Sequence, residues 1–287
     1  GAPIVIKADG LAAGKGVAIL HDEAEARSVA ERMLSGALVG EAGRRAVLEQ
    51  FLPGEEVSFI VLTDGADFYA LPPTQDHKRV HDDDKGPNTG GMGAYTDGRI
   101  LTPTERDQIF GRIVVPTLAG LRRERPYQGF LYFGLMMTPE GPYVLEFNVR
   151  LGDPEAQPLL YSLENDLAPL VEAAAHGRLR DAMVEWSPHP AVCVVAASAG
   201  YPGAYETGKE IFGIDEAEAL GVKVFHAGTK FSEGRLVTSG GRVLGVTAKG
   251  EDLRAAIDNA YAALAEIEFE GMHYRRDIGE KGLARYQ

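Results

Sequence analysis

The stretch from Tyr143 to Glu155 constrains the fold most, because its polar and apolar residues alternate with the period of a β-strand. One face carries Glu146, Asn148 and Arg150, and the other carries only apolar side chains, namely Leu145, Phe147, Val149 and Leu151. The pattern predicts a buried strand whose polar row faces a cleft. A carboxylate, an amide oxygen and a guanidinium in line would suit a hard cation beside a phosphate. The alternative is an amphipathic strand with its polar side in water, against which the turn Gly152–Glu155 argues.

The rest of the chain predicts an α+β fold. The turn Thr138–Gly141 separates expected strands over residues 130–137 and 143–150, which predicts an antiparallel hairpin. Further strands are expected over residues 4–7, 17–20, 47–51, 57–62, 68–71, 192–197, 223–226 and 242–247. Helices are expected after the N-cap Asp22, after the capping box Thr102–Glu105 with a kink or end at Pro116, over residues 167–176, and where Leu253, Ile257, Tyr261 and Leu264 are in register.

Composition excludes several classes of function. The 42 acidic residues outnumber the 29 basic ones, and the formal charge of -13 argues against a nucleic-acid partner. No apolar run approaches the roughly 18–20 residues of a membrane span. Cys193 lies in an apolar run, which predicts a buried hydrophobe and not a nucleophile, and fits a reducing cytoplasm. The chain starts without Met and enters a strand almost at once, so we expect a fragment with earlier residues missing.

A glycine-rich loop follows the first expected strand. Lys7 stands at the strand end, and the loop over residues 8–16 has exposed amides that could cradle phosphate oxygens. The loop lacks the Walker A spacing and its Ser or Thr, so a metal would need ligands elsewhere, which we expect Glu146 and Asn148 to provide. A flexible hairpin tip is the alternative.

Two other stretches have the composition of a binding site. Residues 49–56 join two expected strands with carboxylates at both ends, which suits a purine and a ribose, although surface glutamates around a Pro-Gly turn are commonplace. Residues 72–98 are expected to form a long polar loop, and such loops are usually functional. Its Lys, His and Asp residues and four glycines within residues 86–93 suit a small zwitterionic or phosphorylated substrate. A solvated linker is the alternative, and the spacings match no zinc signature.

Together these motifs resemble the phosphoribosylamine–glycine ligase family of ATP-grasp enzymes. The similarity rests on residues 7–17, on residues 77–80 with 86–93, and on residues 145–155, and it continues through residues 200–203, 226–229, 240–243 and 276–279. It implies an ATP-grasp fold in which ATP lies between a small lid subdomain (1–56) and a larger antiparallel-sheet subdomain (57–187), followed by a small α+β C-terminal domain (188–287).

The resemblance also implies a reaction. ATP, glycine and 5-phosphoribosylamine would give ADP, phosphate and glycinamide ribonucleotide through glycyl phosphate, in purine biosynthesis. The implied cofactors are ATP and Mg²⁺ or Mn²⁺. We expect a cytoplasmic protein without nucleic-acid or membrane partners; the sequence leaves the oligomeric state open, a monomer being one alternative. The family normally begins with a nucleotide-fold domain that this chain lacks, so substrate binding by the fragment alone is expected to be incomplete. The rivals are another ATP-grasp ligase or carboxylase, and a noncatalytic nucleotide-binding module.

Carried over motif by motif, the resemblance implies site residues. ATP would be bound by Lys7, Gly14, Lys15, Gly16, Glu49, Phe51, Leu52 and Glu56. Substrates would be bound by Lys78, Asp82, Asn88, Gly90, Gly91 and Glu155, with Arg150 and Asp153 beside the reacting carboxylate. Glu146 and Asn148 would bind the metal. Other ATP-grasp enzymes have an extra acidic ligand on the preceding strand, and residues 130–137 contain none, so we expect only two protein ligands.

Overall fold

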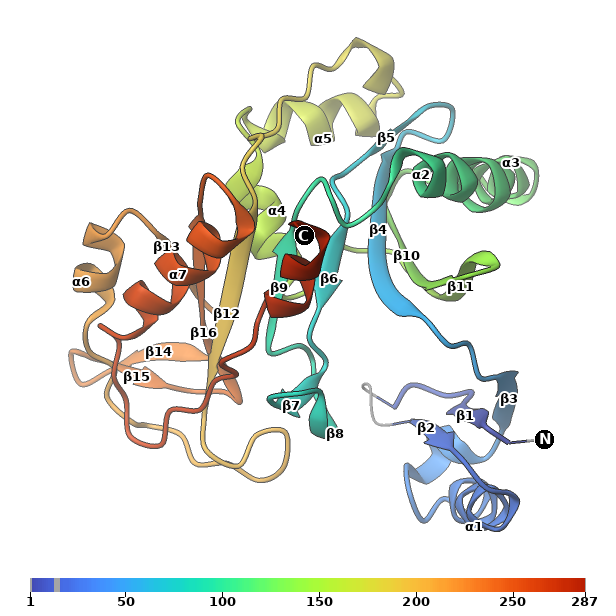
Figure 1. The fold of residues 1–287 in the computed structure, drawn as a ribbon, viewed down its shortest axis with the longest axis horizontal. Helices are drawn as coiled ribbons and strands as arrows, with labels where there is room; N and C mark the ends of the chain where they lie inside the picture. The colour runs from blue at the N-terminus through green and yellow to red at the C-terminus, as the bar shows by residue number, and fades with distance from the viewer. Residues whose placement is uncertain (1, 13–15, 287) are drawn as a thin grey trace. The chain divides into compact units, whose positions relative to one another are not determined.

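The computed structural model describes residues 2–12 and 16–286. They form two compact units, one of Gly1–Gly54 with Asn88–Gly90 and the other of Glu55–Pro87 with Gly91–Gln287 (Figure 1). The described pairings of both main sheets are antiparallel, as the sequence predicts.

The first unit is a three-stranded sheet with a helix against it. The strand order is β2-β1-β3, with β1 at Ile4–Ala8, β2 at Val17–Leu20 and β3 at Ala46–Gln50. Helix α1 spans Glu23–Leu34, and a 3₁₀ turn, η1, spans Gly40–Gly43. The Asp22 carboxylate accepts from the Glu25 N–H at 2.8 Å, so the predicted N-cap is confirmed. Ile6, Leu20 and Met33 form the buried centre of this unit.

The second unit is built on a nine-stranded sheet. Its order is β11-β10-β4-β6-β9-β12-β16-β13, with β5 paired to β4. The bounds are β4 Glu55–Thr63, β5 Phe68–Ala70, β6 Thr74–Asp76, β9 Gly93–Thr96, β10 Gly129–Thr138, β11 Gly141–Asn148, β12 Ala191–Ala197, β13 Lys223–His226 and β16 Arg242–Lys249. The pairing of β9 with β12 joins strands from before and after residue 188, where the C-terminal domain is expected to begin, in one sheet.

The prediction of one long loop over residues 72–98 is wrong. The segment contributes β6 and β9 to the sheet and forms a separate hairpin of β7 (Arg79–His81) with β8 (Lys85–Asn88). Its polar residues can be buried because the fold supplies partners. The Gln75 amide, for instance, donates to the Glu56 carbonyl oxygen at 2.9 Å.

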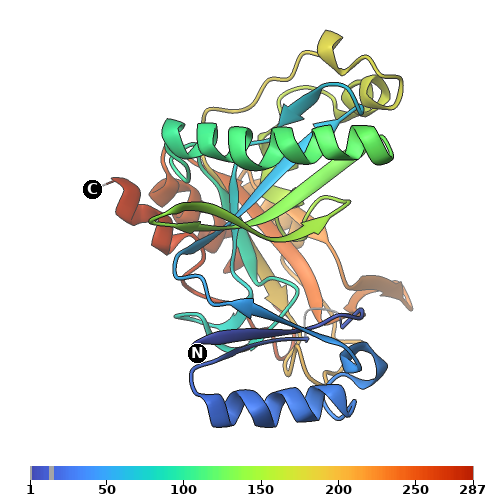
Figure 2. The same ribbon diagram turned by 90° about the vertical axis from the view of Figure 1, so that its right-hand side faces the viewer.

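Helices cover both faces of the sheet in the second unit, and in Figure 2 the ribbon from α2 to α3 crosses the strands. The helical elements are α2 Pro103–Ile109, η2 Phe110–Val114, α3 Val115–Glu124, α4 Ala156–Ser162, α5 Leu167–Ala175, η3 Leu179–Asp181, α6 Ile214–Ala219, α7 Leu253–Leu264 and η4 Glu280–Tyr286. A two-stranded hairpin, β14 (Thr229–Ser232) with β15 (Arg235–Thr238), completes the unit. The predicted capping box at Thr102 is present.

Two sequence predictions in this unit have different outcomes. The helix does not end at Pro116, because η2 is a π-helical turn placed directly before it, and the α-helical pattern resumes at Val115 and continues to Glu124. Cys193 is fully buried on β12, and burial raises the pKa of its thiol to about 12, so the prediction of a buried hydrophobe is confirmed. Across residues 2–12 and 16–286, no helix combines the length and apolarity needed to cross a membrane.

The strand at Glu146 differs most from its prediction. Strand β11 is the edge of the sheet and ends at Asn148, and its apolar row is open, with Phe147 50% and Val149 69% exposed. A β-bulge at Leu145 interrupts the pairing, since Gly134 faces Glu146 whereas Leu135 faces Val144. The predicted hairpin is confirmed, but the prediction of a buried strand extending to Arg150 is wrong.

Candidate active site

In the first unit, Lys7 and Glu49 lie on one face of the small sheet. Val5 pairs with Glu49, and Lys7 is two residues further along β1, so both side chains project from the same side. The Lys7 ammonium lies 2.6 Å from the Glu49 carboxylate. The structure thus brings together two of the residues expected to bind ATP.

The other residues expected in the lid have separate positions. Gly16 closes the loop, with its carbonyl accepting from the Ala8 N–H at 2.7 Å, and a Cβ on it would lie 2.7 Å from the Ala12 Cβ. Phe51 and Leu52 follow β3, are half-buried, and Phe51 makes an edge contact with His21. Gly14 and Lys15 lie outside the described residues.

In the second unit, Glu146 and Asn148 share a face of the large sheet. They pair with Gly134 and Tyr132 of β10, which are two residues apart, so both side chains point to the same side. The Asn148 amide lies 3.4 Å from the Glu146 carboxylate. A Cβ on Gly134 would lie 3.0 Å from the Glu146 Cγ, so the Glu146 side chain lies directly over this position of β10.

Lys78 adds a positive charge to this region. Its ammonium contacts the Glu56 carboxylate at 2.5 Å. Burial would lower the pKa of Lys78, but the carboxylates of Glu56, Asp76 and Glu146 outweigh it, so the pKa is raised and the ammonium keeps its charge. Glu56, expected at the ribose, and Lys78, expected at the substrate, are therefore direct partners.

Glu155 is buried on this same face, where it is 4% exposed. Its carboxylate accepts hydrogen bonds from Ser58 at 3.0 Å and from Tyr132 at 2.9 Å, and the two hydroxyls lie 2.6 Å apart. Burial, followed by the Glu155 charge, raises the pKa of Asp76 well above its usual range. The sequence predicts no role for Ser58, Asp76 or Tyr132.

Arg150 and Asp153 follow β11 but have different partners. The exposed Arg150 donates to the Leu151 carbonyl at 2.8 Å. Asp153 forms an ion pair with Arg242 of β16 at 2.9 Å, and the same guanidinium donates to the Asp153 carbonyl at 2.6 Å. Arg242 lies within residues 240–243, which contribute to the family resemblance, but the sequence predicts no role for it, because 89 residues separate it from its partner and only the fold joins them.

The residues expected in the substrate loop are divided between the units. Asp82 accepts from the Arg276 N–H at 2.8 Å, and Gly91 is buried with a φ of +112°. Asn88 and Gly90 belong to the first unit. A Cβ on Gly91 would lie 2.7 Å from an Asp76 carboxylate oxygen and would overlap Pro154, so this backbone conformation requires glycine.

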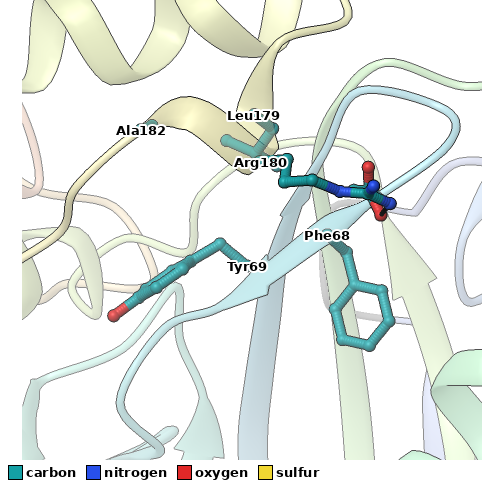
Figure 3. Close-up of a pocket in the computed structure, with 6 residues that line it drawn as sticks. Phe68, Tyr69, Leu179, Arg180 and Ala182 are labelled. Atoms are coloured by element: carbon teal, nitrogen blue, oxygen red, sulfur yellow. Dashed lines mark hydrogen bonds and ion pairs between the residues drawn. The ribbon is translucent and has the colours of Figure 1, made fainter.

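The described residues do not form a preassembled metal site of acidic, His or Cys side chains. Across residues 2–12 and 16–286, no group of three or more His, Cys, Asp or Glu side chains could hold a metal ion. A pocket of about 220 Å³ lies elsewhere in the second unit, between β5 and η3 (Figure 3), and its lining consists of Asp67, Phe68, Tyr69, Leu179, Arg180 and Ala182. None of these six was expected in the site.

Comparison with known proteins places these features in a family. Residues 1–156 match the family model of the phosphoribosylglycinamide synthetase ATP-grasp (A) domain, and residues 191–281 match that of the C domain. Phosphoribosylamine–glycine ligase of Pseudomonas aeruginosa is 50% identical over 287 residues, covering 99% of this chain and 67% of the relative. The enzyme of the same name from Vibrio vulnificus is 48% identical, covering 100% of this chain and 67% of its own length.

Solved structures agree. The crystal structure of phosphoribosylamine–glycine ligase from Thermotoga maritima has a TM-score of 0.84 and 40% identity, covering 96% of this chain and 68% of that chain. A biotin carboxylase domain from Hydrogenobacter thermophilus, at 19% identity and a TM-score of 0.69, covers 96% of this chain and 59% of that chain, and shares the fold alone. The chain therefore belongs to the phosphoribosylamine–glycine ligase family of ATP-grasp enzymes.

Proposed function

We propose that this chain carries the ATP-dependent ligation of glycine to 5-phosphoribosylamine, giving glycinamide ribonucleotide, ADP and phosphate. The relatives that it matches over nearly its whole length bear the name of that activity. The observation that supports the proposal best is the sheet face on which two oxygen ligands for a hard cation, Glu146 and Asn148, lie together. Lys78 lies near enough to Glu146 for the negative charge of that carboxylate to contribute to the raised pKa of Lys78.

Glu146 and Asn148 would hold Mg²⁺ or Mn²⁺. A carboxylate and an amide are suitable oxygen donors for either ion, and the two side chains are close enough to hydrogen bond. The ion would supply charge neutralisation for the phosphate oxygens of ATP. Because residues 130–137 of β10 include no acidic side chain, water and ATP oxygens would complete the coordination.

In the first unit, Lys7, Gly16, Glu49, Phe51 and Leu52 are proposed to bind ATP. Lys7 would exchange part of its contact with Glu49 for phosphate oxygens, and the aromatic and aliphatic pair after β3 would pack against adenine. Gly14 and Lys15 complete the proposed set, and Glu56 would bind the ribose.

The proposed chemistry has two steps. A glycine carboxylate oxygen takes the γ-phosphoryl group as the bond to ADP breaks, and the amine nitrogen then attacks the acyl carbon and phosphate leaves. Arg150 and Arg242 would stabilise the negative charge, with Asp153 orienting Arg242 through its ion pair. Asp82, Asn88, Gly90, Gly91 and Glu155 are proposed to shape the substrate site, Glu155 from below the surface.

Substrate-dependent release of ADP tests this function. On the full-length protein, release should require both glycine and phosphoribosylamine, and equal release without glycine would refute the proposal. A requirement for bicarbonate or biotin would instead indicate an ATP-grasp carboxylase, and ATP binding without turnover would indicate a nucleotide-binding module.

Three variants test the assigned roles. Glu146→Gln should reduce the dependence of ATP binding on Mg²⁺ in calorimetry, and an unchanged dependence would contradict the metal assignment. Lys7→Ala should weaken ATP binding, whereas Arg150→Ala should chiefly lower turnover. Equal losses of nucleotide affinity in the last two variants would contradict this division of roles.

A further inference from the structure

Arg275 is the largest fully buried side chain described in the protein, and the proposed reaction gives it no task. It is 1% exposed, and its guanidinium is bonded to carboxylates and to a backbone carbonyl. Its guanidinium donates to both carboxylate oxygens of Asp277 at 2.8 and 2.6 Å, to Asp84 at 2.8 Å and to the Arg79 carbonyl at 3.1 Å. A buried guanidinium is stable only when it is paired in this way, so Arg275 joins the C-terminal segment firmly to the β7–β8 hairpin.

The tip of that hairpin has a backbone that needs support. Asp83 and Asp84 have φ values of 58° and 52°, in the left-handed region that non-glycine residues seldom occupy. The Asp83 N–H donates to Asp277 at 2.9 Å, and the Asp82 carboxylate accepts from the Arg276 N–H at 2.8 Å. The three consecutive aspartates of the tip are thus each bonded to residues 275–277.

The same C-terminal segment also holds the residues on either side of Lys78. The Gly279 N–H donates to His77 at 3.3 Å, and the Arg79 carbonyl accepts from Arg275. Just beyond, the His273 ring contacts the Val80 carbonyl at 2.9 Å. The backbone of Lys78 is therefore anchored at both neighbours, and β8 continues directly into the glycine-rich stretch.

We propose that Arg275 is a positioning residue, which fixes residues 77–85 so that Lys78 and the glycine-rich stretch after β8 have the geometry that binds the small substrates. The expected effect on the KM for the small substrates rests on the proposed function. The structural part of the inference, a hairpin held by a buried arginine from the far end of the chain, stands on the contacts alone.

The kinetic test uses the full-length protein with Arg275→Met, Arg275→Lys and the control Arg276→Met. Arg276 is the neighbouring arginine, and its side chain is exposed. In Arg275→Met, the KM for glycine or phosphoribosylamine should rise by between about tenfold and about a hundredfold, because a misplacement of roughly 1 Å can cost about a hundredfold. The KM for ATP should change less than about twofold. Arg275→Lys should recover part of the loss, since it restores the charge, and the control should match the parent.

A purely structural role would give a different result. It would lower the melting temperature and the active fraction, hence kcat, while leaving all three KM values unchanged, and that outcome would overturn the proposal. Equal increases in all three KM values would overturn it too. If Arg275→Met does not fold, Asp277→Asn serves instead, because it keeps the shape of the partner and removes its charge, and the same KM pattern is expected at smaller size.

Hydrogen exchange separates this inference from the proposed function. In Arg275→Met, the amides of residues 79–85 should exchange faster while those of β10 and β12 keep their protection. If the parent protein shows no glycine-dependent turnover, the proposed function fails, yet faster exchange confined to residues 79–85 would still support the bracing of the hairpin. Unchanged exchange there, or faster exchange throughout the second unit, would refute it.

Discussion

Removing the Tyr132 hydroxyl should measurably destabilise the second unit. The hydroxyl donates to the Glu155 carboxylate at 2.9 Å and lies 2.6 Å from Ser58, and Tyr132, Ser58 and Glu155 are 5%, 4% and 4% exposed. Tyr132→Phe keeps the ring and its packing, so the loss isolates the hydrogen bonds.

The size of the effect follows from the partners. A hydrogen bond to a carboxylate contributes about 1.5–3 kcal/mol, and Ser58 would still donate to Glu155, so we expect a loss of about 2 kcal/mol. At about 2–4 °C per kcal/mol for large domains, the melting temperature should fall by about 4–8 °C. Thermal unfolding followed by circular dichroism and calorimetry measures the change.

Tyr143→Phe is the matched control. Tyr143 lies on the neighbouring strand β11, is 40% exposed, and donates to Glu140 at 3.2 Å. Because its hydroxyl can bond to water instead, the control should lose less than about 0.5 kcal/mol. Equal melting temperatures for the two variants would refute the reasoning that burial makes the Tyr132 bonds costly to remove.

Three further predictions concern the same region. Burial and the charge of Glu155 raise the pKa of Asp76, so the folded protein binds a proton at Asp76 more tightly than the unfolded chain does. Stability is therefore lost as the pH rises above the unfolded pKa of 3.8. Asp76→Asn should reduce that loss when melting temperatures are measured against pH. Burial lowers the pKa of His77 to about 3, so on acidification the unfolded chain binds a proton at His77 before the folded protein does. Stability is therefore lost as the pH falls below the unfolded pKa of 6.5. His77→Gln should make the loss of stability with acidification less steep, and an unchanged pH profile would contradict a neutral buried ring. Gly91→Ala should destabilise by about 1–3 kcal/mol in thermal unfolding because of its left-handed backbone and close neighbours, whereas Gly98→Ala, with open space around it, should not.

Local sequence signals predicted local structure well. The cap at Asp22, the capping box at Thr102 and the hairpin turn at Thr138–Gly141 are specified by side chains within a few residues of each other, so no information from the rest of the fold is needed. The alternation around Glu146 likewise predicted that Glu146 and Asn148 would share a face.

The errors arose where distant segments decide the outcome. Strand β6 was predicted as loop because its polar residues can be buried only with hydrogen-bond partners from β4. Strand β11 was predicted to be buried because its own sequence does not show that it is the edge strand of the described sheet. The pairing of Asp153 with Arg242 joins residues that are 89 positions apart in the sequence. Residue type and spacing therefore suffice to propose a chemistry for the site, whereas the buried contacts around it are visible only in the tertiary structure.

The β-bulge at Leu145 makes the hairpin unusually tolerant of a change in length. Since Val144 and Glu146 face consecutive residues of β10, Leu145 is the extra residue of the bulge, and its deletion would leave the strand pairing on both sides in register. A deletion anywhere else between the turn and Glu146 would shift the strand against its neighbour. Shortening the hairpin by one residue at Leu145 should therefore leave the proposed metal ligands Glu146 and Asn148 on the same face.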